Sequence, residues 1–214
     1  MAPSSAIGVA QQSAAAPLRR PANPSRRELL LDAAAQILAR GHADEVTVET
    51  VARRAGVSRA LVYKHFADRQ ELLGALYERE SLLLHRQLSA AVKECDRLES
   101  MLRALVEGAL TAQATRSATF VALAGEGARP AGQRARQRRR DVRTLRYFTD
   151  QAVRELSIDP ELAEPAMRMA LAGIASVLET WRLRPTGESV RLLSEMYVSM
   201  TMGGLQVLAS VTHS

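Results

Sequence analysis

Apolar side chains recur at helical spacing along most of the chain beyond residue 24. The first clear run has apolar residues at positions i, i+3, i+4, i+7 and i+8, which lie on one face of a helix: Leu30, Ala33, Ala34, Ile37 and Leu38. No stretch of useful length alternates apolar and polar residues as a half-buried strand does. The pattern therefore predicts an all-α protein with about nine helices.

Residue types that start and stop helices divide this pattern into elements. Ser25, Asp68 and Asp159 stand where N-caps are expected, with Glu or Pro in the turn that follows each of them. Glycine and proline interrupt the pattern at 125–132, which is expected to be a loop. A separate short helix is expected over 118–124, immediately before that loop.

The most specific motif is VTVETVARRAGVSRALVYKHF, which occupies residues 46–66. Two short helices can cross closely here because Ala52 is small, and Gly56 permits a turn in which a positive φ would strain a residue with a Cβ atom. Valines are expected to fill the space between the two helices, and their spacing around Gly56 is typical of the helix-turn-helix. Four residues of the second helix are expected to face outward, toward a major groove: Arg59, Ala60, Tyr63 and Lys64.

This motif, followed by Asp-x-x-Glu-Leu-Leu, resembles the signature of the TetR family of bacterial transcriptional regulators. The close resemblance covers about residues 26–76, and the remainder matches only as a helical domain of suitable length. The resemblance implies a three-helix DNA-binding domain at 25–70 and a helical effector-binding and dimerisation domain at 71–214. Residues 1–24, rich in Ala, Ser, Gln and Pro, are expected to form a flexible tail.

The resemblance also implies DNA contacts near the starts of the two short helices. Thr47 would contact a phosphate through its hydroxyl and backbone N–H, and Ser58 would cap the second helix and touch phosphate. Ala60 stands where many members carry Gly close to the DNA backbone, so the approach to the duplex is expected to differ slightly. Arg69 stands where members often carry Lys, and it keeps the positive charge.

The rest of the second helix would supply the remaining contacts. By the same resemblance, Arg59 and Lys64 would reach base edges or nearby phosphates, and Tyr63 and His65 would hydrogen-bond the DNA backbone. Packing inside the protein is the alternative for Tyr63 and His65, whereas Phe66 is expected to be a core anchor.

The charge balance fits an anionic partner. The chain carries a net charge of +6, and residues 19–64 hold nine basic and five acidic side chains. Such a balance suits double-stranded DNA, whose phosphates are neutralised on binding, or a membrane surface. A helical protein that binds small molecules or anionic lipid is therefore the rival interpretation. The arginines at 19, 20, 26 and 27 either reach a minor groove or belong only to a disordered tail.

Arginines are densest over 134–146, where one face of a helix would hold Arg136, Arg139, Arg140, Arg143 and Arg146. The main interpretation is a solvated face of an amphipathic helix, and the alternative is a site for an anionic ligand or a second DNA contact. His85, alone in its segment, is interpreted as a packed or surface histidine.

The sequence lacks the patterns of catalytic and metal sites. Its four histidines have no metal-ligand spacing, and no G-x-S-x-G motif or phosphate loop occurs. Cys95 is the only cysteine, which excludes a disulfide within the chain and favours a cytoplasmic location. No apolar run approaches the roughly 20 residues that span a bilayer. We therefore expect no enzymatic activity, no cofactor, no metal and no membrane partner.

The last two helices are too apolar for the surface of a monomer. They are expected over 159–182 and 188–210, and in the TetR family such helices form the four-helix interface of a homodimer. The resemblance also implies an effector pocket, for which we expect an uncharged lining: Leu105, Phe120, Leu123, Tyr147, Phe148, Ile174, Leu178 and Trp181. The resulting prediction is a repressor that binds a pseudo-palindromic operator and is released by a small hydrophobic or amphipathic ligand.

Overall fold

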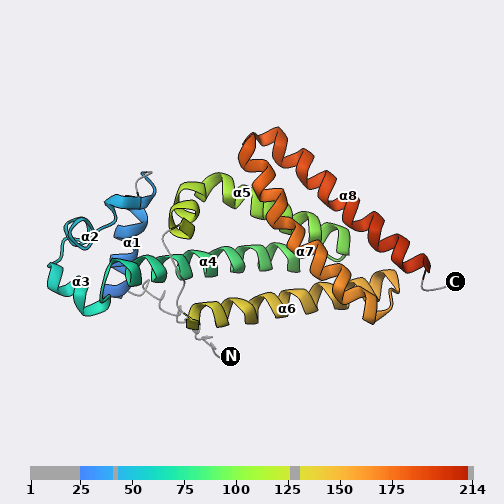
Figure 1. The fold of residues 1–214 in the computed structure, drawn as a ribbon, viewed down its shortest axis with the longest axis horizontal. Helices are drawn as coiled ribbons and strands as arrows, with labels where there is room; N and C mark the ends of the chain where they lie inside the picture. Colours follow the sequence, from blue (N-terminus) through green and yellow to red (C-terminus); the bar gives the residue numbers. More distant parts are fainter. Residues whose placement is uncertain (1–24, 41–42, 126–130, 212–214) are drawn as a thin grey trace, which may run out of the picture.

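Helices and the short connections between them form the whole of the chain that the computed structural model describes (Figure 1). The backbone is described for residues 25–40, 43–125 and 131–211, and side chains are described there except at 43 and within 115–134. The tail predicted at 1–24 lies outside the described residues.

Eight α-helices and one 3-10 helix make up the described chain, so the predicted fold class is confirmed and the predicted number of helices is close. In order, they are α1 (Arg26–Leu38), the 3-10 helix η1 (Ala43–Glu45), α2 (Val48–Ala55), α3 (Arg59–His65), α4 (Arg69–Lys93), α5 (Leu98–Gly125), α6 (Ala131–Leu156), α7 (Pro160–Leu183) and α8 (Gly187–Val211).

The helix α5 is longer than the sequence pattern suggested. Residues 118–124, which we expected to form a separate helix, are the last turns of α5, so that prediction was wrong. The reason is that α5 contains no proline, and its internal Gly108 only weakens a helix locally.

Two separate groups of buried apolar side chains share α4. The first runs from Leu30 of α1 to Leu76 in the first half of α4 and includes the inward faces of α2 and α3. The second begins at Val92 near the end of α4 and continues through α5 to α8 as far as Leu205. One continuous helix of 25 residues therefore connects the two cores.

Ion pairs tie α4 to its neighbours between these cores. Arg79 of α4 bonds to carboxylates of α1, and the adjacent Glu78 lies 2.6 Å from Nε of Arg136 on α6. The helices α1, α4 and α6 are therefore linked at one level of α4.

The second core brings together helices that are far apart in the sequence. α5 packs against α4 and α8, while α7 packs against α6 and α8. In Figure 1, α8 runs along the outer edge of this part of the molecule and α6 extends alongside α4. The hydroxyl of Tyr197 on α8 donates a hydrogen bond to the carbonyl of Ala170 on α7 at 2.9 Å, and burial raises the pKa of Tyr197 to about 12.

Candidate nucleic-acid interface and ligand cavity

A reciprocal capping box begins α2. The Thr47 hydroxyl accepts a hydrogen bond from the backbone N–H of Thr50 at 3.2 Å, and the Thr50 hydroxyl accepts one from the N–H of Thr47 at 2.9 Å. The N–H of Thr47, which we expected to meet a phosphate, is therefore already bonded inside the protein. The hydroxyl of Thr47 is the group that can still turn toward an external acceptor.

The turn between α2 and α3 depends on the backbone conformation of Gly56. This residue has φ +66°, and its N–H and that of Val57 donate to the carbonyls of Arg53 and Ala52, which closes the end of α2. A Cβ atom at Gly56 would have open space around it, so φ and not crowding favours glycine here.

Four of the residues predicted to contact DNA form the exposed face of α3: Arg59, Ala60, Tyr63 and Lys64. The side chain of Tyr63 is 54% exposed, which argues against the alternative that it packs in the interior. Val62 and Phe66 are buried on the opposite face, as expected for Phe66, and His65 is half-buried between the two faces. The helix therefore presents a polar surface while an apolar surface anchors it.

The start of α3 carries a cap and an ion pair. The Ser58 side chain accepts a hydrogen bond from the N–H of Leu61 at 3.3 Å. Nη1 of Arg59 lies 3.0 Å from Oε1 of Glu49 on α2, a contact that the sequence analysis did not anticipate. Both side chains are at least half exposed, and exposed pairs contribute less than about 1 kcal/mol, so a phosphate can replace Glu49.

Two arginines hold the ends of the motif in place. The Arg27 guanidinium lies over the ring of Phe66, 5.1 Å from its centroid, and Nε of Arg69 donates to the carbonyl of Val46 at 2.8 Å. These contacts attach the motif to α1 and α4. The Arg69 side chain therefore bonds to the start of the motif within the protein.

A cavity of about 710 Å³ lies among α4, α5, α6 and α7. Three of the residues predicted for an effector pocket line it, namely Leu105, Ile174 and Leu178. A smaller cavity of about 180 Å³ adjoins it, is lined by Tyr147, and shares the side chain of His85 with the larger one.

Two further residues predicted for the pocket lie elsewhere. Phe148 and Trp181 are buried in the second core, at 1% and 6% exposure, and the cavity lining does not include them. Phe120 and Leu123 belong to the part of α5 whose side chains are outside the described residues.

Three charged side chains and a histidine also line the larger cavity, whereas we expected an uncharged lining: Arg138, Asp141, Arg168 and His85. The arginine run over 134–146 was the signal in the sequence for this charge. Only the packing of α6 beside the other helices turns part of that run toward a cavity.

Positive charge dominates the surroundings of His85. Burial lowers the pKa of His85, the positive charges of Arg140 and Arg143 lower it further, and Asp141 opposes them. The Asp141 carboxylate accepts a hydrogen bond from the side-chain amide of Gln137 at 2.7 Å.

Neither a membrane span nor a metal centre is evident in the described residues. No helix among them is long and apolar enough to cross a bilayer. No cluster of at least three His, Cys, Asp or Glu side chains in the same residues could hold a metal ion.

Comparison with known proteins identifies the family of the N-terminal motif. Residues 30–76 match the family model of bacterial regulatory proteins of the tetR family. The HTH-type transcriptional regulator BetI of Brucella canis is 32% identical to the chain over 83 residues, which are 39% of the chain. In that match the chain spans 42% of the length of the relative. BetI of Cronobacter sakazakii is 27% identical over 190 residues, which cover 85% of the chain and 93% of the relative. The segment 30–76 therefore has the N-terminal domain of the tetR family.

A solved structure shows that the likeness in fold extends to the helices after the motif. The transcriptional regulator FadR from Bacillus subtilis, solved in complex with stearoyl-CoA, superposes with a TM-score of 0.62 at 16% identity. The alignment covers 82% of this chain and 97% of the FadR chain. The likeness in fold therefore includes the helices around the cavity.

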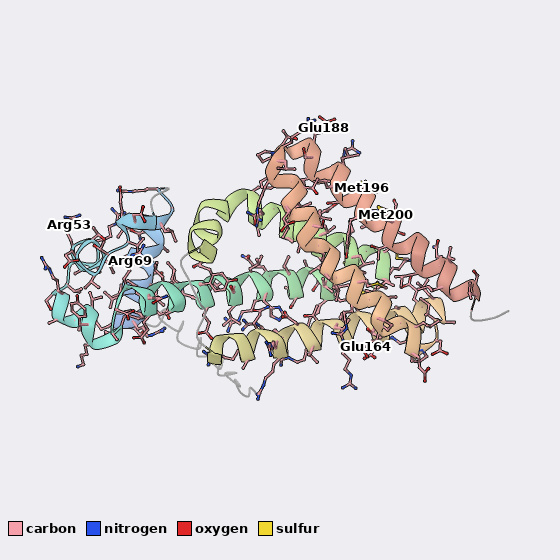
Figure 2. The ribbon with its side chains drawn as sticks, in the orientation of Figure 1. Arg53, Arg69, Glu164, Glu188, Met196 and Met200 are labelled. Atoms are coloured by element: carbon pink, nitrogen blue, oxygen red, sulfur yellow. The ribbon has the colours of Figure 1, made fainter. Side chains whose placement is uncertain are left out.

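The last helix of the chain, α8, carries an exposed apolar stripe: Leu192, Met196, Met200, Val207 and Val211. These side chains are between 47% and 73% exposed, and Figure 2 marks Met196 and Met200 along α8. The first four of these residues lie within 188–210, where a dimer interface was expected, and Val211 follows directly. Ile174 of α7, in contrast, lines the cavity.

Proposed function

We propose that this chain is a DNA-binding transcriptional repressor of the TetR family that acts as a homodimer and leaves its operator when a small ligand binds. The observation that carries this proposal is the exposed polar face of α3, which follows the left-handed turn at Gly56 within the segment that matches the family model. Two such faces related by a two-fold axis would read half-sites about 34–36 Å apart on a pseudo-palindromic operator.

The proposed DNA-binding residues are those that the motif places on α3 and at the starts of α2 and α3: Thr47, Ser58, Arg59, Ala60, Tyr63, Lys64 and His65. Lys64 is exposed, and among the described residues no carboxylate pairs with it, so it is available for a base edge or a phosphate. Tyr63 is exposed enough to donate its hydroxyl to the DNA backbone.

The proposed dimer forms through α7 and α8. The stripe on α8 exposes several large apolar side chains in a row, which is unusual on a monomer surface and typical of an interface. A two-fold axis would place the stripe of one subunit against that of its partner and remove these side chains from water.

The proposed effector site is the cavity among α4 to α7. Its volume of about 710 Å³ falls within the range of small-molecule pockets. The stearoyl-CoA complex of the similarly folded FadR supports a hydrophobic or amphipathic ligand here. The helix α4 lines the cavity through His85 and bonds to α1 through Arg79, so a ligand that favours one position of α4 would change the placement of the DNA-binding helices.

Selection of bound DNA from a random pool tests this proposal directly. We expect an enriched palindrome, and we expect Lys64→Ala to weaken binding to it. Anionic liposomes measured in parallel test the rival interpretation. Liposome binding without any enriched DNA sequence would overturn the proposed function.

A further inference from the structure

One wall of the larger cavity is an apolar stripe on α7. Leu171, Ile174 and Leu178 line the cavity at spacings of three and four residues, and Leu105 contributes from α5. Leu171 and Leu178 are seven positions apart, which is about 10 Å along the helix and enough for several methylene groups of an extended chain.

The wall contributed by α6 changes from polar to apolar along its length. Arg138 and Asp141 come first, and Val142 and Leu145 follow on the same face of the helix. Among the described residues no carboxylate pairs with Arg138, while the Asp141 carboxylate is hydrogen-bonded to Gln137 at 2.7 Å. Arg138 is therefore the cation of this wall that is available to a ligand.

Arginines near the cavity outnumber Asp141, which is the one carboxylate among the described residues that line it. Arg168 of α7 lines the cavity and pairs with Glu164, one helical turn earlier. Arg143 lines the adjoining cavity, and its positive charge contributes to the lowered pKa of His85. The surroundings of the cavity are therefore positive on the side of α6, although its volume is mostly bounded by apolar side chains.

We propose that this cavity binds an anionic amphiphile, whose negatively charged head group pairs with Arg138 while its apolar body lies along Leu171, Ile174 and Leu178. The proposal rests on the ligand-controlled regulator proposed above and names the class of its ligand. A guanidinium can bind a carboxylate or phosphate through two parallel N–H donors. An uncharged ligand would gain nothing from the charge of Arg138, and a small polar anion would gain nothing from the apolar stripe.

Three probes of equal chain length separate the possible ligand classes. The full-length chain is titrated calorimetrically with dodecanoate, dodecanol and dodecylamine, each at concentrations where the probe is monomeric. We expect dodecanoate to bind about tenfold more tightly than dodecanol, or better, and dodecylamine to bind most weakly.

Arg138→Gln is expected to remove the preference for dodecanoate over dodecanol. Arg146→Gln is the matched control, because Arg146 lies on the same helix, is exposed, pairs weakly with Asp150 at 3.9 Å and is not part of the lining. It is expected to keep the preference. Circular dichroism confirms that each variant is folded.

Ala175→Phe tests where the probes bind. Ala175 lines the cavity with a small side chain, so a phenyl ring there would occupy the space of the apolar body. Both dodecanoate and dodecanol should then fail to bind. If Ala175→Phe still binds dodecanoate, the anion lies on the surface and the proposed site is overturned.

Two further outcomes would also overturn the ligand class: equal affinity for dodecanoate and dodecanol, or an unchanged preference in Arg138→Gln. Release of the selected operator is measured separately. If dodecanoate binds as expected without releasing DNA, the ligand class stands and the proposed effector function fails. If operator DNA is selected but dodecanoate does not bind, the ligand class fails alone.

Discussion

The Nη1 atom of Arg79 lies 2.7 Å from Oδ1 of Asp32, and this contact joins α4 to α1 across 47 residues of sequence. The same nitrogen donates to Glu28 at 3.2 Å, and Nη2 donates to the carbonyl of Leu31 at 3.4 Å. Burial disfavours the charge, but the hydrogen bonds to Asp32 and Glu28 outweigh it and raise the pKa of Arg79. The helix that lines the cavity therefore also holds the first helix of the DNA-binding module.

Arg79→Met is expected to lower the free energy of unfolding by about 1–3 kcal/mol, because two carboxylates and a carbonyl lose a donor. Urea denaturation measures the change. Arg86→Met is the control, since Arg86 is an exposed arginine on the same helix. A loss below about 0.5 kcal/mol in Arg79→Met would show that the contact does not stabilise the fold.

Gly56→Ala is expected to destabilise the chain by about 1–2 kcal/mol. The cost comes from the positive φ, which strains a residue with a Cβ atom, because the added methyl group would contact nothing. Thermal and urea unfolding report the loss, and operator binding should weaken with it because the turn orients α3. Gly187→Ala is a matched control with equally open space and no positive φ. Equal stability of the two variants would mean that the turn tolerates alanine.

Lys64→Ala is expected to weaken operator binding by about 1–3 kcal/mol if Lys64 contacts a base. If Lys64 contacts a phosphate instead, the variant is expected to bind all DNA sequences more weakly to a similar extent. Fluorescence anisotropy with the selected operator and with unrelated DNA distinguishes the two. Lys93→Ala is the control: it removes the same charge at the end of α4 that is far from α3, and it should leave affinity unchanged. Unchanged affinity in Lys64→Ala would remove this residue from the interface.

Met200→Glu is expected to break the proposed dimer and, with it, operator binding. Met200 is 73% exposed in the single chain, and a charge buried in an apolar interface costs several kcal/mol unless it is paired. Light scattering measures the mass. Gln206→Glu places the same charge on an exposed position of α8 outside the stripe and should remain a dimer. A dimeric Met200→Glu would place the interface elsewhere.

His85 is expected to titrate below its ordinary pKa of 6.5, because burial and then the positive charges of Arg140 and Arg143 disfavour its protonated form. As pH falls through about 6.5, the unfolded chain gains this proton before the folded chain does, so the free energy of unfolding decreases in that window. NMR titration of the ring, assigned with His85→Gln, measures the pKa. A midpoint at or above 6.5 would contradict the described environment. Bound dodecanoate should raise the midpoint.

Local signals in the sequence determined where most helices begin. Four predicted N-caps are observed as caps, namely Ser25, Ser58, Asp68 and Asp159, and Thr47 caps α2 in the same way. A cap bonds only to an N–H two or three residues ahead, so its information is local. The conformation of Gly56 is equally local, and the helix-turn-helix was therefore predictable from its own 21 residues, 46–66.

The lining of the cavity and the neighbours of each helix were decided only by the tertiary structure. The sequence analysis interpreted His85 as an isolated histidine, placed Arg138 in a solvated charge run, and assigned Ile174 to both interface and pocket, yet all three line one cavity. The ion pair of Arg59 with Glu49 was not anticipated for the same reason. Helical periodicity states which residues share a face, but which helix covers that face depends on packing between segments distant in the chain.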